Sequence, residues 1–347
     1  AAAARGRELG ASVDVYEKGA RVGGSMLLSS GVIWRYAEWD EFRRQCPGGD
    51  EPLQRAVHDG VDEAIEWLRG LGAVVTEEST GNPLTSGKRF DTRELCVALL
   101  RTGPSLRIGS PLEEIDAGVP VILATGGFQA SADLVREWIT PEADSLLVRS
   151  NSCNEGDGLR MGLAAGGERS AGLDEFYGRA MPAVASLHET HWVQAAQLYA
   201  RWAIEIVDEN GERFDGAVDW AEVDVVQWIA RRPGTRAWFV VPESALGERA
   251  RYGTVAEMIE RARGLGAAVE RLDDGVRVEV AAAITQTLGG LRIDPNGRVA
   301  PGVWAAGGDA GGVATGGYMS NLASALVMGR RAAEDALRYP SVQSGPL

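Results

Sequence analysis

Glycine pairs recur along this chain, and they constrain its fold more than any other feature of the sequence. Examples are Gly126-Gly127 and Gly307-Gly308, and ten of the 45 glycines lie between residues 289 and 317. Glycine is favoured where the backbone takes a positive φ or must approach a ligand closely. A loop-rich fold is the simpler interpretation, but we expect several of these loops to surround one large planar or phosphate-bearing cofactor.

The charge balance limits the classes of ligand. The 347-residue chain has 49 acidic and 35 basic residues, and its formal net charge of −14 repels nucleic-acid phosphates and anionic lipid. No apolar run approaches the roughly 18 residues that suggest a membrane span, and no signal peptide opens the sequence. We therefore expect a cytoplasmic protein that binds neither nucleic acid nor membrane.

Metal chemistry is not expected from this sequence. Only three histidines occur, which are too few convergent ligands for an ordinary zinc site. The cysteines form neither a Cys-x-x-Cys pair nor a haem-attachment pattern, so we expect them to be reduced and buried. They are Cys46, Cys96 and Cys153.

The first residues indicate part of a dinucleotide-binding unit. Residues 1–9 are good helix formers, Gly10 is a helix stop, and residues 12–17 read as a short strand that ends at Glu17. In a βαβ dinucleotide-binding unit, a carboxylate at this place accepts hydrogen bonds from the adenosine ribose hydroxyls. The G-x-G-x-x-G phosphate loop that precedes such a helix is absent, so we expect the first strand and this loop to be omitted from the sequence.

Separated segments farther along the chain carry a specific resemblance. Residues 17–31 contain Glu-Lys-Gly, Val-Gly-Gly-Ser and Ser-Ser-Gly, residues 121–128 read VILATGGF, residues 156–166 read GDGLRMGLAAG, residues 287–291 read TLGGL, residues 301–312 read PGVWAAGGDAGG, and residues 322–330 read LASALVMGR. In this order the segments resemble the fumarate reductase and succinate dehydrogenase flavoprotein superfamily, which includes 3-ketosteroid dehydrogenases. The resemblance covers most of the chain and is thinnest in the middle.

The resemblance implies an α/β protein with two domains. A Rossmann-like FAD-binding domain of the GR2 type would comprise residues 1–177 and 276–347, without its first strand and phosphate loop. An inserted α+β capping domain would comprise residues 178–275, which hold five of the ten tryptophans. In the family the capping domain closes on the FAD domain, and the substrate lies in the crevice between them.

Individual elements of the capping domain are visible in the sequence. Residues 204–207 read as a strand, and residues 210–214 read as a turn that resembles the family's Gly-x-Arg-Phe hairpin. Residues 225–231 and 255–265 have apolar residues at helical spacing and predict two amphipathic helices.

The resemblance also implies a set of FAD-binding residues in glycine turns, at strand ends and at helix starts. The strand at 119–123 is continuously apolar, as a strand covered on both faces must be, and the helix at 319–337 would direct its N-terminal amides at the flavin. Asp157 either contacts the flavin or only caps its helix. The predicted cofactor residues are Glu17, Lys18, Gly23, Gly24, Ser25, Ser29, Ser30, Gly31, Ala124, Thr125, Gly126, Gly127, Asp157, Gly308, Asp309, Asn321 and Leu322.

Several residues that fumarate reductases use have no counterpart here. Their arginine proton donor follows the Arg-Phe hairpin, but residues 215–230 contain acids and no arginine. Gln286 stands where they carry a histidine, and residues 316–318 replace their late arginine. We therefore do not expect a C4 dicarboxylate as the substrate. No histidine precedes His58, so the resemblance implies that FAD is held noncovalently.

Four residues are candidates for contact with the substrate. Tyr177 and Arg179 follow the Gly-Asp-Gly helix, where relatives place a substrate-contacting segment, and the arginine fork suits a planar anion or a carbonyl. Tyr318 is expected to act as an acid or base, as tyrosine does in ketosteroid dehydrogenases, and Thr287 opens the Thr-Leu-Gly-Gly segment. A surface ion pair for Arg179 and a packed ring for Tyr318 are the alternatives.

Two hypotheses of function follow. In the first, the chain is an FAD-dependent oxidoreductase acting on CH–CH groups: hydride moves between flavin N5 and a carbon next to a carbonyl, on a small ketosteroid- or enoate-like substrate, with a separate electron acceptor or donor. In the second, it is a catalytically incompetent flavoprotein-like binding or structural subunit that has lost its phosphate loop. The short stretch at 106–119 fits the second hypothesis, or the omission of some segments.

Overall fold

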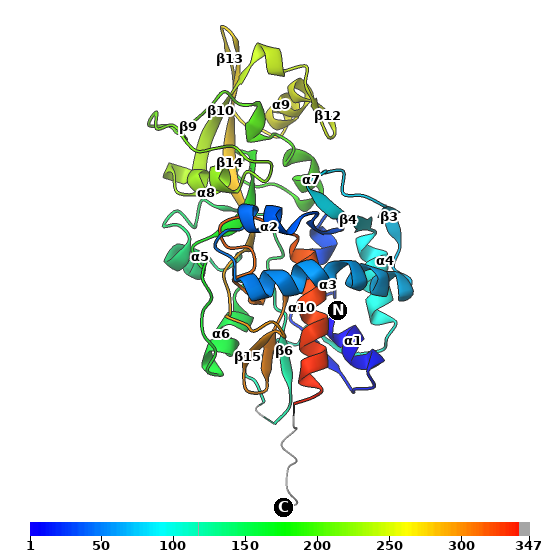
Figure 1. Ribbon diagram of the computed structural model, residues 1–347. Coiled ribbons are helices and arrows are strands. Elements are labelled where there is room, and N and C mark those ends of the chain that lie inside the picture. Colours follow the sequence, from blue (N-terminus) through cyan, green and yellow to red (C-terminus); the bar gives the residue numbers. More distant parts are fainter. Residues whose placement is uncertain (117, 340–347) are drawn as a thin grey trace, which may run out of the picture. The chain divides into compact units, whose positions relative to one another are not determined.

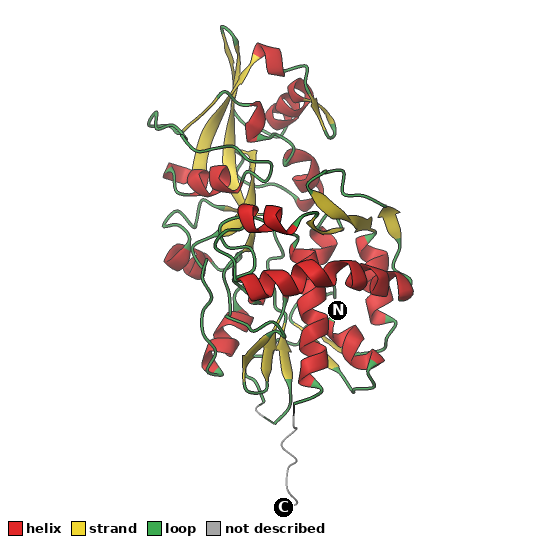
Figure 2. Ribbon diagram, in the orientation of Figure 1, coloured by secondary structure: helices red, strands yellow, loops and turns green. Residues whose placement is uncertain are grey.

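The computed structural model describes residues 1–116 and 118–339, and the chain divides into two compact units. Unit 1 comprises Ala1–Ser131, Asn151–Leu173 and Thr287–Leu347, and unit 2 comprises Ala132–Ser150 and Asp174–Gln286. Helices and strands alternate in both units (Figure 2), which confirms the predicted mixed α/β class. The GR2 topology and the domain limits at residues 178 and 275 stay predictions.

Unit 1 contains helices, short strands and two 3₁₀ turns. Its elements are α1 (Ala2–Glu8), β1 (Asp14–Glu17), η1 (Gly24–Leu28), β2 (Val32–Tyr36), α2 (Trp39–Gln45), α3 (Glu51–Gly70), β3 (Val75–Glu77), β4 (Thr85–Phe90), α4 (Thr92–Leu100), β5 (Ser105–Ile108), β6 (Val121–Leu123), α6 (Asp157–Ala164), β15 (Arg298–Ala300), β16 (Val303–Ala305), η6 (Gly307–Asp309) and α10 (Asn321–Ala336).

The strands of unit 1 form three small sheets. β1 pairs in parallel with β5, and β16 pairs in parallel with β6 and antiparallel with β15. The third sheet is antiparallel, in the order β2-β4-β3. Because β6 and β16 run in parallel, the loops at their C-terminal ends, which begin at Ala124 and Ala306, leave the same edge of the sheet.

Helices α3 and α10 form the centre of unit 1, and α1 packs against α10 (Figure 1). Leu53, Val57 and Val61 are buried at helical spacing along α3, whose opposite face is polar. The α3 N-terminus is capped by Asp50, which accepts a hydrogen bond from the Leu53 N–H at 3.1 Å. Trp304 of β16 is fully buried against α10, so the sheet that carries the glycine loops is fixed to this helix.

Unit 2 is built on one larger sheet with short helices. Its elements are α5 (Ala132–Trp138), β7 (Leu147–Val148), β8 (Phe176–Pro182), η2 (Glu189–His191), α7 (Trp192–Ala195), η3 (Ala200–Trp202), β9 (Glu205–Val207), α8 (Val223–Ala230), η4 (Pro233–Thr235), β10 (Arg236–Pro242), η5 (Glu243–Ala245), β11 (Arg249–Ala250), β12 (Gly253–Thr254), α9 (Val255–Gly264), β13 (Val269–Leu272) and β14 (Gly275–Thr287), of which β14 reaches the boundary with unit 1.

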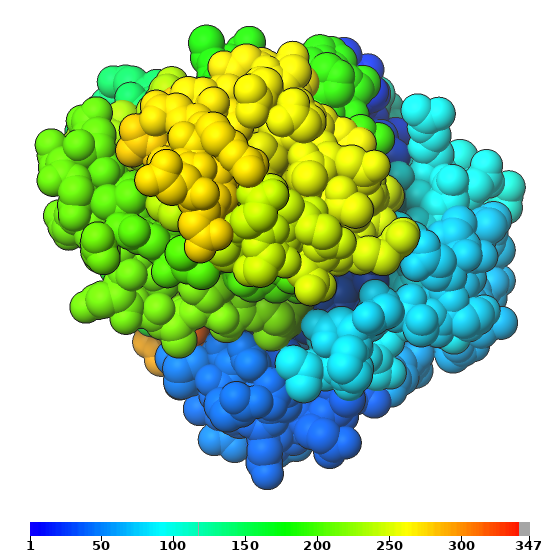
Figure 3. Space-filling model, turned by 90° about the horizontal axis from the view of Figure 1, so that it is seen from above, coloured from blue at the N-terminus to red at the C-terminus, as the bar shows by residue number. Residues whose placement is uncertain are grey.

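The long strand β14 organises this sheet. The strand order is β13-β14-β10-β9, and β7 and β8 pair with the later part of β14. α8 packs against β8, and the Gln227 amide donates a hydrogen bond to the Phe176 carbonyl at 3.3 Å. α9 begins with a complete capping box between Thr254 and Glu257, and its surface forms part of the yellow face in Figure 3. α9 follows the prediction closely, and α8 begins two residues earlier than predicted.

Two details differ from the sequence predictions. The strand predicted at 119–123 begins only at Val121, and Val119 is 54% exposed because it belongs to the turn before the strand. Cys46 is buried as predicted, whereas Cys96 and Cys153 are half-buried. Within residues 1–116 and 118–339, no helix combines the length and the apolar content needed to cross a membrane.

Candidate functional site

The two loops that leave the β6–β16 edge meet at Asp309. This side chain is only 1% exposed, and its carboxylate accepts hydrogen bonds from the Thr125 backbone N–H, from the Thr125 hydroxyl at 2.9 Å and from the Gly127 N–H at 3.1 Å. Burial raises the pKa of Asp309, and these donors act in the opposite direction. Asp309 therefore joins the Ala-Thr-Gly-Gly turn to the Gly-Gly-Asp turn.

The close approach of these loops explains their glycines. A Cβ on Gly308 would lie 2.5 Å from the Gly126 carbonyl oxygen, which is shorter than the van der Waals distance between two nonbonded atoms. Gly127 has a φ of +88°, and a Cβ there would lie 2.6 Å from the Thr287 hydroxyl. The loops therefore touch through their backbones, and side chains at these positions would separate them.

A third predicted segment joins the same cluster. The Gly158 N–H at the start of α6 donates to the Thr125 hydroxyl at 2.9 Å. Asp157 does not cap the helix, since the N-cap residue is Gly156; its carboxylate instead accepts hydrogen bonds from Lys18 at 2.7 Å and from Arg160 at 2.7 Å. The capping alternative for Asp157 is thus wrong, and Lys18 connects the segment after β1 to α6.

The segment that begins at Glu17 contacts the loop before α6 in a second place. The Asn154 amide donates to the Ser25 hydroxyl at 2.9 Å. Glu17 ends β1 as predicted, and its carboxylate accepts the Gly19 N–H at 2.7 Å, which fixes the side chain at the end of the strand. Four predicted cofactor segments therefore meet within unit 1.

The remaining predicted cofactor residues also lie in unit 1. Gly23, with a φ of +110°, is the N-cap residue of η1, and Gly24 is the first residue of η1. The Ser29 hydroxyl accepts the Gly31 N–H at 3.1 Å in the turn that follows. Ser30 and Ala124 are exposed.

The N-terminus of α10 supplies backbone amides. The Ser320 hydroxyl accepts the Ala323 N–H at 3.3 Å and donates to the Val32 carbonyl at 3.2 Å. The amides of Asn321 and Leu322 precede the first intrahelical hydrogen bond, as the first amides of every helix do. An anionic or carbonyl group is stabilised at such an end.

One buried polar atom supports the fit of a ligand to this part of unit 1. Thr287 is 5% exposed, and its hydroxyl has no hydrogen-bond partner among the residues that the structure describes. The Thr287 hydroxyl lies beside Gly127, which belongs to the turn that contacts Gly308. A buried hydroxyl without a partner is costly in the free protein, so a bound group that hydrogen-bonds to it fits the site.

Tyr318 is held beside two other aromatic residues of unit 1. The Tyr36 hydroxyl donates to the Tyr318 carbonyl at 2.6 Å, and the rings of Trp34 and Tyr318 meet edge to face with centres 5.5 Å apart. The Tyr318 side chain is half-buried. Tyr318 therefore has the packed ring of the alternative interpretation. The same contacts hold its side chain in position.

The other two predicted catalytic residues lie together in unit 2. On β8, the Arg179 Nε donates to the Tyr177 hydroxyl at 3.0 Å. The centre of the Arg179 guanidinium is 5.5 Å from the ring centre of Tyr177 and 5.5 Å from that of Tyr199. Arg179 is thus not the surface ion pair of the alternative, because its side chain is only 14% exposed.

Sequence reasoning missed the acidic partner of Arg179. Glu222 lies 3.5 Å from the Arg179 guanidinium, with a side chain that is 3% exposed. Burial raises the pKa of Glu222 to about 7, while Arg179 acts to lower it. The one available signal was the run of acids without an arginine at residues 215–230, in which Glu222 stands.

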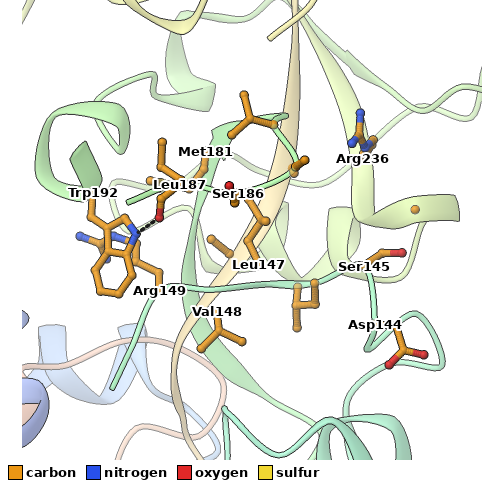
Figure 4. Close-up of a pocket in the computed structure, with 16 residues that line it drawn as sticks. Asp144, Ser145, Leu147, Val148, Arg149, Met181, Ser186, Leu187, Trp192 and Arg236 are labelled. Atoms are coloured by element: carbon orange, nitrogen blue, oxygen red, sulfur yellow. Dashed lines mark hydrogen bonds between the residues drawn. The ribbon is translucent and has the colours of Figure 1, made fainter. Parts of the chain in front are cut away.

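Unit 2 also holds an open cavity of about 490 Å³ (Figure 4). Trp192 and Arg149 stand on one side of it and Arg236 on the other, and the Trp192 indole N–H donates to the Leu187 carbonyl at 3.0 Å. Both arginines have partners: Arg149 donates to the Thr285 hydroxyl at 3.1 Å, and Arg236 forms an ion pair with Glu279. The cavity lining mixes apolar side chains with polar and charged ones, including Asp144, Ser186 and the two arginines.

Metal ligands do not gather anywhere in residues 1–116 and 118–339: no group of three His, Cys, Asp or Glu side chains there is arranged to hold an ion.

Comparison with known proteins shows the family of the chain. The model of a family described as FAD binding domain matches residues 102–321, which is more than half of the chain. No curated protein sequence matches the chain.

Solved flavoproteins share the fold over nearly the whole chain. The open conformation of a flavocytochrome c3 fumarate reductase has a TM-score of 0.70 at 17% identity, covering 97% of this chain and 76% of that one. The 3-ketosteroid Δ4-(5α)-dehydrogenase from Rhodococcus jostii RHA1 has a TM-score of 0.68 at 18% identity, covering 96% and 93%.

A third structure is the 3-ketosteroid Δ1-dehydrogenase from Sterolibacterium denitrificans, with a TM-score of 0.72 at 15% identity, covering 98% of this chain and 97% of that one. At these identities the likeness is one of fold. With the family match, it confirms the resemblance carried by the glycine motifs. The chain belongs to the family described as FAD binding domain, and it shares its fold with a fumarate reductase and two 3-ketosteroid dehydrogenases.

Proposed function

We propose that this protein is an FAD-dependent oxidoreductase that makes or reduces a C=C bond next to a carbonyl group. The observation that carries the proposal is the cluster around Asp309, in which predicted cofactor segments from four parts of the chain are joined by hydrogen bonds. Such convergence is expected when separate loops share one ligand. No comparison supports the alternative of a catalytically incompetent subunit.

Several residues of unit 1 would hold the FAD. Glu17 at the end of β1 would accept hydrogen bonds from the adenosine ribose, and the Asn321 and Leu322 amides would face polar atoms of the ring system. We reassign Thr287, which the sequence predicts as a substrate contact, to the cofactor, because its buried hydroxyl lies beside Gly127 and has no partner among the described residues. We propose noncovalent binding, because no histidine precedes His58. Bound FAD supplies hydride exchange at its N5 atom.

The substrate would be bound and protonated by side chains of this chain. Arg179, steadied by the Tyr177 hydroxyl, would donate hydrogen bonds to the carbonyl oxygen and so stabilise the negative charge that develops there. The Tyr318 phenol would give or take the proton at the carbon next to the carbonyl. We assign residues 1–177 and 276–347 to a Rossmann-like FAD-binding domain of the GR2 type and residues 178–275 to a capping domain.

The partners of this reaction would be a small carbonyl-containing substrate and a separate electron acceptor or donor. The balance is simple: one hydride and one proton leave two adjacent carbons when the C=C bond forms, and both return when it is reduced. The known ligands of the two ketosteroid dehydrogenase structures are 4-androstene-3,17-dione and 1,4-androstadiene-3,17-dione. A ketone of this kind is our first choice for testing.

An anaerobic titration tests the proposal. Reduced protein is mixed with candidate enones, and oxidised protein with the corresponding saturated ketones, while the visible flavin absorbance is followed. We expect bleaching or recovery with at least one pair, and Tyr318→Phe should slow it about a hundredfold or more without releasing flavin. Flavin that exchanges electrons with none of these compounds would contradict the assignment.

A further inference from the structure

The buried pair Arg179–Glu222 in unit 2 has features that packing alone does not explain. Two charges removed from water cost more than a hydrophobic pair of the same size unless their geometry is excellent. Here the closest approach is 3.5 Å, and the side chains are only 14% and 3% exposed. A buried ion pair with this geometry contributes little to the stability of the fold, which favours a functional role for the two residues.

The backbone at Glu222 adds an independent observation. Its φ is +59°, and among the described residues only Glu222 and Thr235 adopt a positive φ without being glycine. A left-handed glutamate is strained, and strain of this kind concentrates at functional sites. The Asp219 carboxylate accepts the Glu222 N–H and supports this conformation just before α8. The fold therefore turns a strained residue so that its carboxylate faces Arg179.

The groups around Glu222 come from three parts of unit 2. β8 contributes Arg179, the η3 turn contributes the Arg201 N–H, which donates to the Glu222 carboxylate at 3.4 Å, and the preceding loop contributes Asp219. The Tyr199 ring lies between the two arginines, 5.5 Å from Arg179 and 4.6 Å from Arg201. Arg179 forms an ion pair with the Glu222 carboxylate, and the positive charges of Arg179 and Arg201 both act to lower the pKa of Glu222.

The consequence concerns the charge of the ligand at Arg179. An arginine whose charge is cancelled by a buried carboxylate still presents N–H donors, but it no longer attracts an anion, and a second carboxylate nearby would be repelled. Flanked by two phenol rings, such a donor suits an uncharged, flat carbonyl compound.

We propose that Glu222 is a specificity residue that makes the Arg179 site select an uncharged carbonyl compound, such as a cyclic enone, over a carboxylate. This inference rests on the proposed function in one respect, namely that Arg179 faces the substrate. Glu222 acts through Arg179 and does not itself contact the substrate.

Two compounds with the same ring test the inference on the purified protein with its bound flavin. They are 2-cyclohexen-1-one and 1-cyclohexene-1-carboxylate, and their binding is measured by calorimetry at about pH 8, above the pKa of about 7 at which Glu222 titrates. The wild type should bind the enone more tightly. In Glu222→Gln the ratio of the two affinities should shift toward the carboxylate by about tenfold or more.

Two controls separate this effect from a general one. Glu205→Gln removes the acid of another Arg–Glu pair in unit 2, with Arg213 at 2.8 Å, and should leave the ratio unchanged. Arg179→Gln added to Glu222→Gln should abolish the gain in carboxylate binding. If Glu222→Gln fails to fold, the wild type measured at about pH 6 should shift its ratio in the same direction.

The inference is overturned if the ratio is the same in Glu222→Gln and the wild type, if the wild type prefers the carboxylate, or if neither compound binds. These outcomes are distinct from those of the flavin titration. Electron exchange with enones at an unchanged ratio overturns the role of Glu222 alone. A shifted ratio in a protein whose flavin never exchanges electrons overturns the proposed oxidoreductase function alone.

Discussion

The Thr125 hydroxyl donates a 2.9 Å hydrogen bond to the Asp309 carboxylate, although 184 residues separate them in the sequence. The same hydroxyl accepts the Gly158 N–H at 2.9 Å, so a single threonine joins the Ala-Thr-Gly-Gly turn, the Gly-Gly-Asp turn and the start of α6. Asp309 is the acceptor on which this arrangement depends, because the Thr125 N–H, the Thr125 hydroxyl and the Gly127 N–H all donate to its buried carboxylate.

Replacing Asp309 with asparagine should therefore loosen the cofactor loops. The amide NH₂ would face N–H donors, leaving at least one buried group unsatisfied, and we expect the free energy of unfolding to fall by about 1–3 kcal/mol. Flavin content should fall as well. Urea unfolding and the flavin-to-protein absorbance ratio measure both effects. Asp133→Asn, whose side chain is 96% exposed, is the control, and equal behaviour of the two variants would contradict the role given to Asp309.

The buried hydroxyl of Thr287 allows a sharper test of the cofactor site. Thr287→Val keeps the shape of the side chain and removes a hydroxyl that has no partner within residues 1–116 and 118–339, so the flavin-free protein should lose no stability. Affinity for FAD should nevertheless fall about tenfold, which corresponds to one lost hydrogen bond.

Thr315→Val is the matched control for this variant. Thr315 is also buried, at 7% exposed, and its hydroxyl likewise finds no partner in the part of the chain that the structure describes. It contacts Gly48 and Gly172 rather than Gly127. If both variants lower FAD affinity equally, or if neither does, Thr287 does not contact the flavin.

Backbone contact between the two glycine turns gives a third prediction. A Cβ on Gly308 would lie 2.5 Å from the Gly126 carbonyl oxygen, so Gly308→Ala must push the loops apart. We expect a loss of about 1–3 kcal/mol in the free energy of unfolding and a clear loss of flavin. Gly70→Ala, at the end of α3 with open space around it, should leave both quantities nearly unchanged. A Gly308→Ala protein with full flavin content would refute the close packing.

The raised pKa of Glu222 predicts how stability depends on pH. Burial raises this pKa from 4.5 to about 7, so the folded state holds the proton more tightly than the unfolded state does. The contribution of Glu222 to the free energy of unfolding is then greatest below the unfolded pKa. It declines by about 3 kcal/mol as the pH rises through the folded pKa.

Urea unfolding across this range checks the prediction. The difference in unfolding free energy between the wild type and Glu222→Gln should change in favour of the variant as the pH rises from about 4.5 to about 7. Glu205→Gln provides the comparison, because its side chain is more exposed and pairs at the surface with Arg213. A difference that stays constant through the window would show that Glu222 titrates normally.

Much of the fold was predictable because the signals are local. β1 ends at Glu17 as predicted, and α9 and α10 lie within one or two residues of their predicted bounds, since apolar spacing and caps define them. The meeting of Thr125 with Asp309 was predictable from glycine turns that follow apolar strands. The start of the strand at Val119 was predicted wrongly, because an apolar residue in a turn cannot be told by its type from one in a strand.

The polar cluster of unit 2 was only half predictable. Tyr177 and Arg179 were found because they follow a recognisable motif, and the structure places them in contact. Glu222 approaches Arg179 because its backbone is left-handed just before α8 and because α8 packs on β8. Neither feature produces a periodic pattern in the sequence, so Glu222 was missed. The Lys18–Asp157 hydrogen bond was missed for the same reason: it joins two loops whose register depends on tertiary contacts.

The visible absorption spectrum of the purified protein, before and after addition of FAD, tests the central claim most directly. If the glycine turns around Thr125 and Asp309 hold the cofactor, the protein carries or takes up FAD, shows the two visible bands of oxidised flavin, and releases the flavin intact when it is precipitated with acid. A folded protein that shows no flavin bands and leaves added FAD unbound would contradict the account.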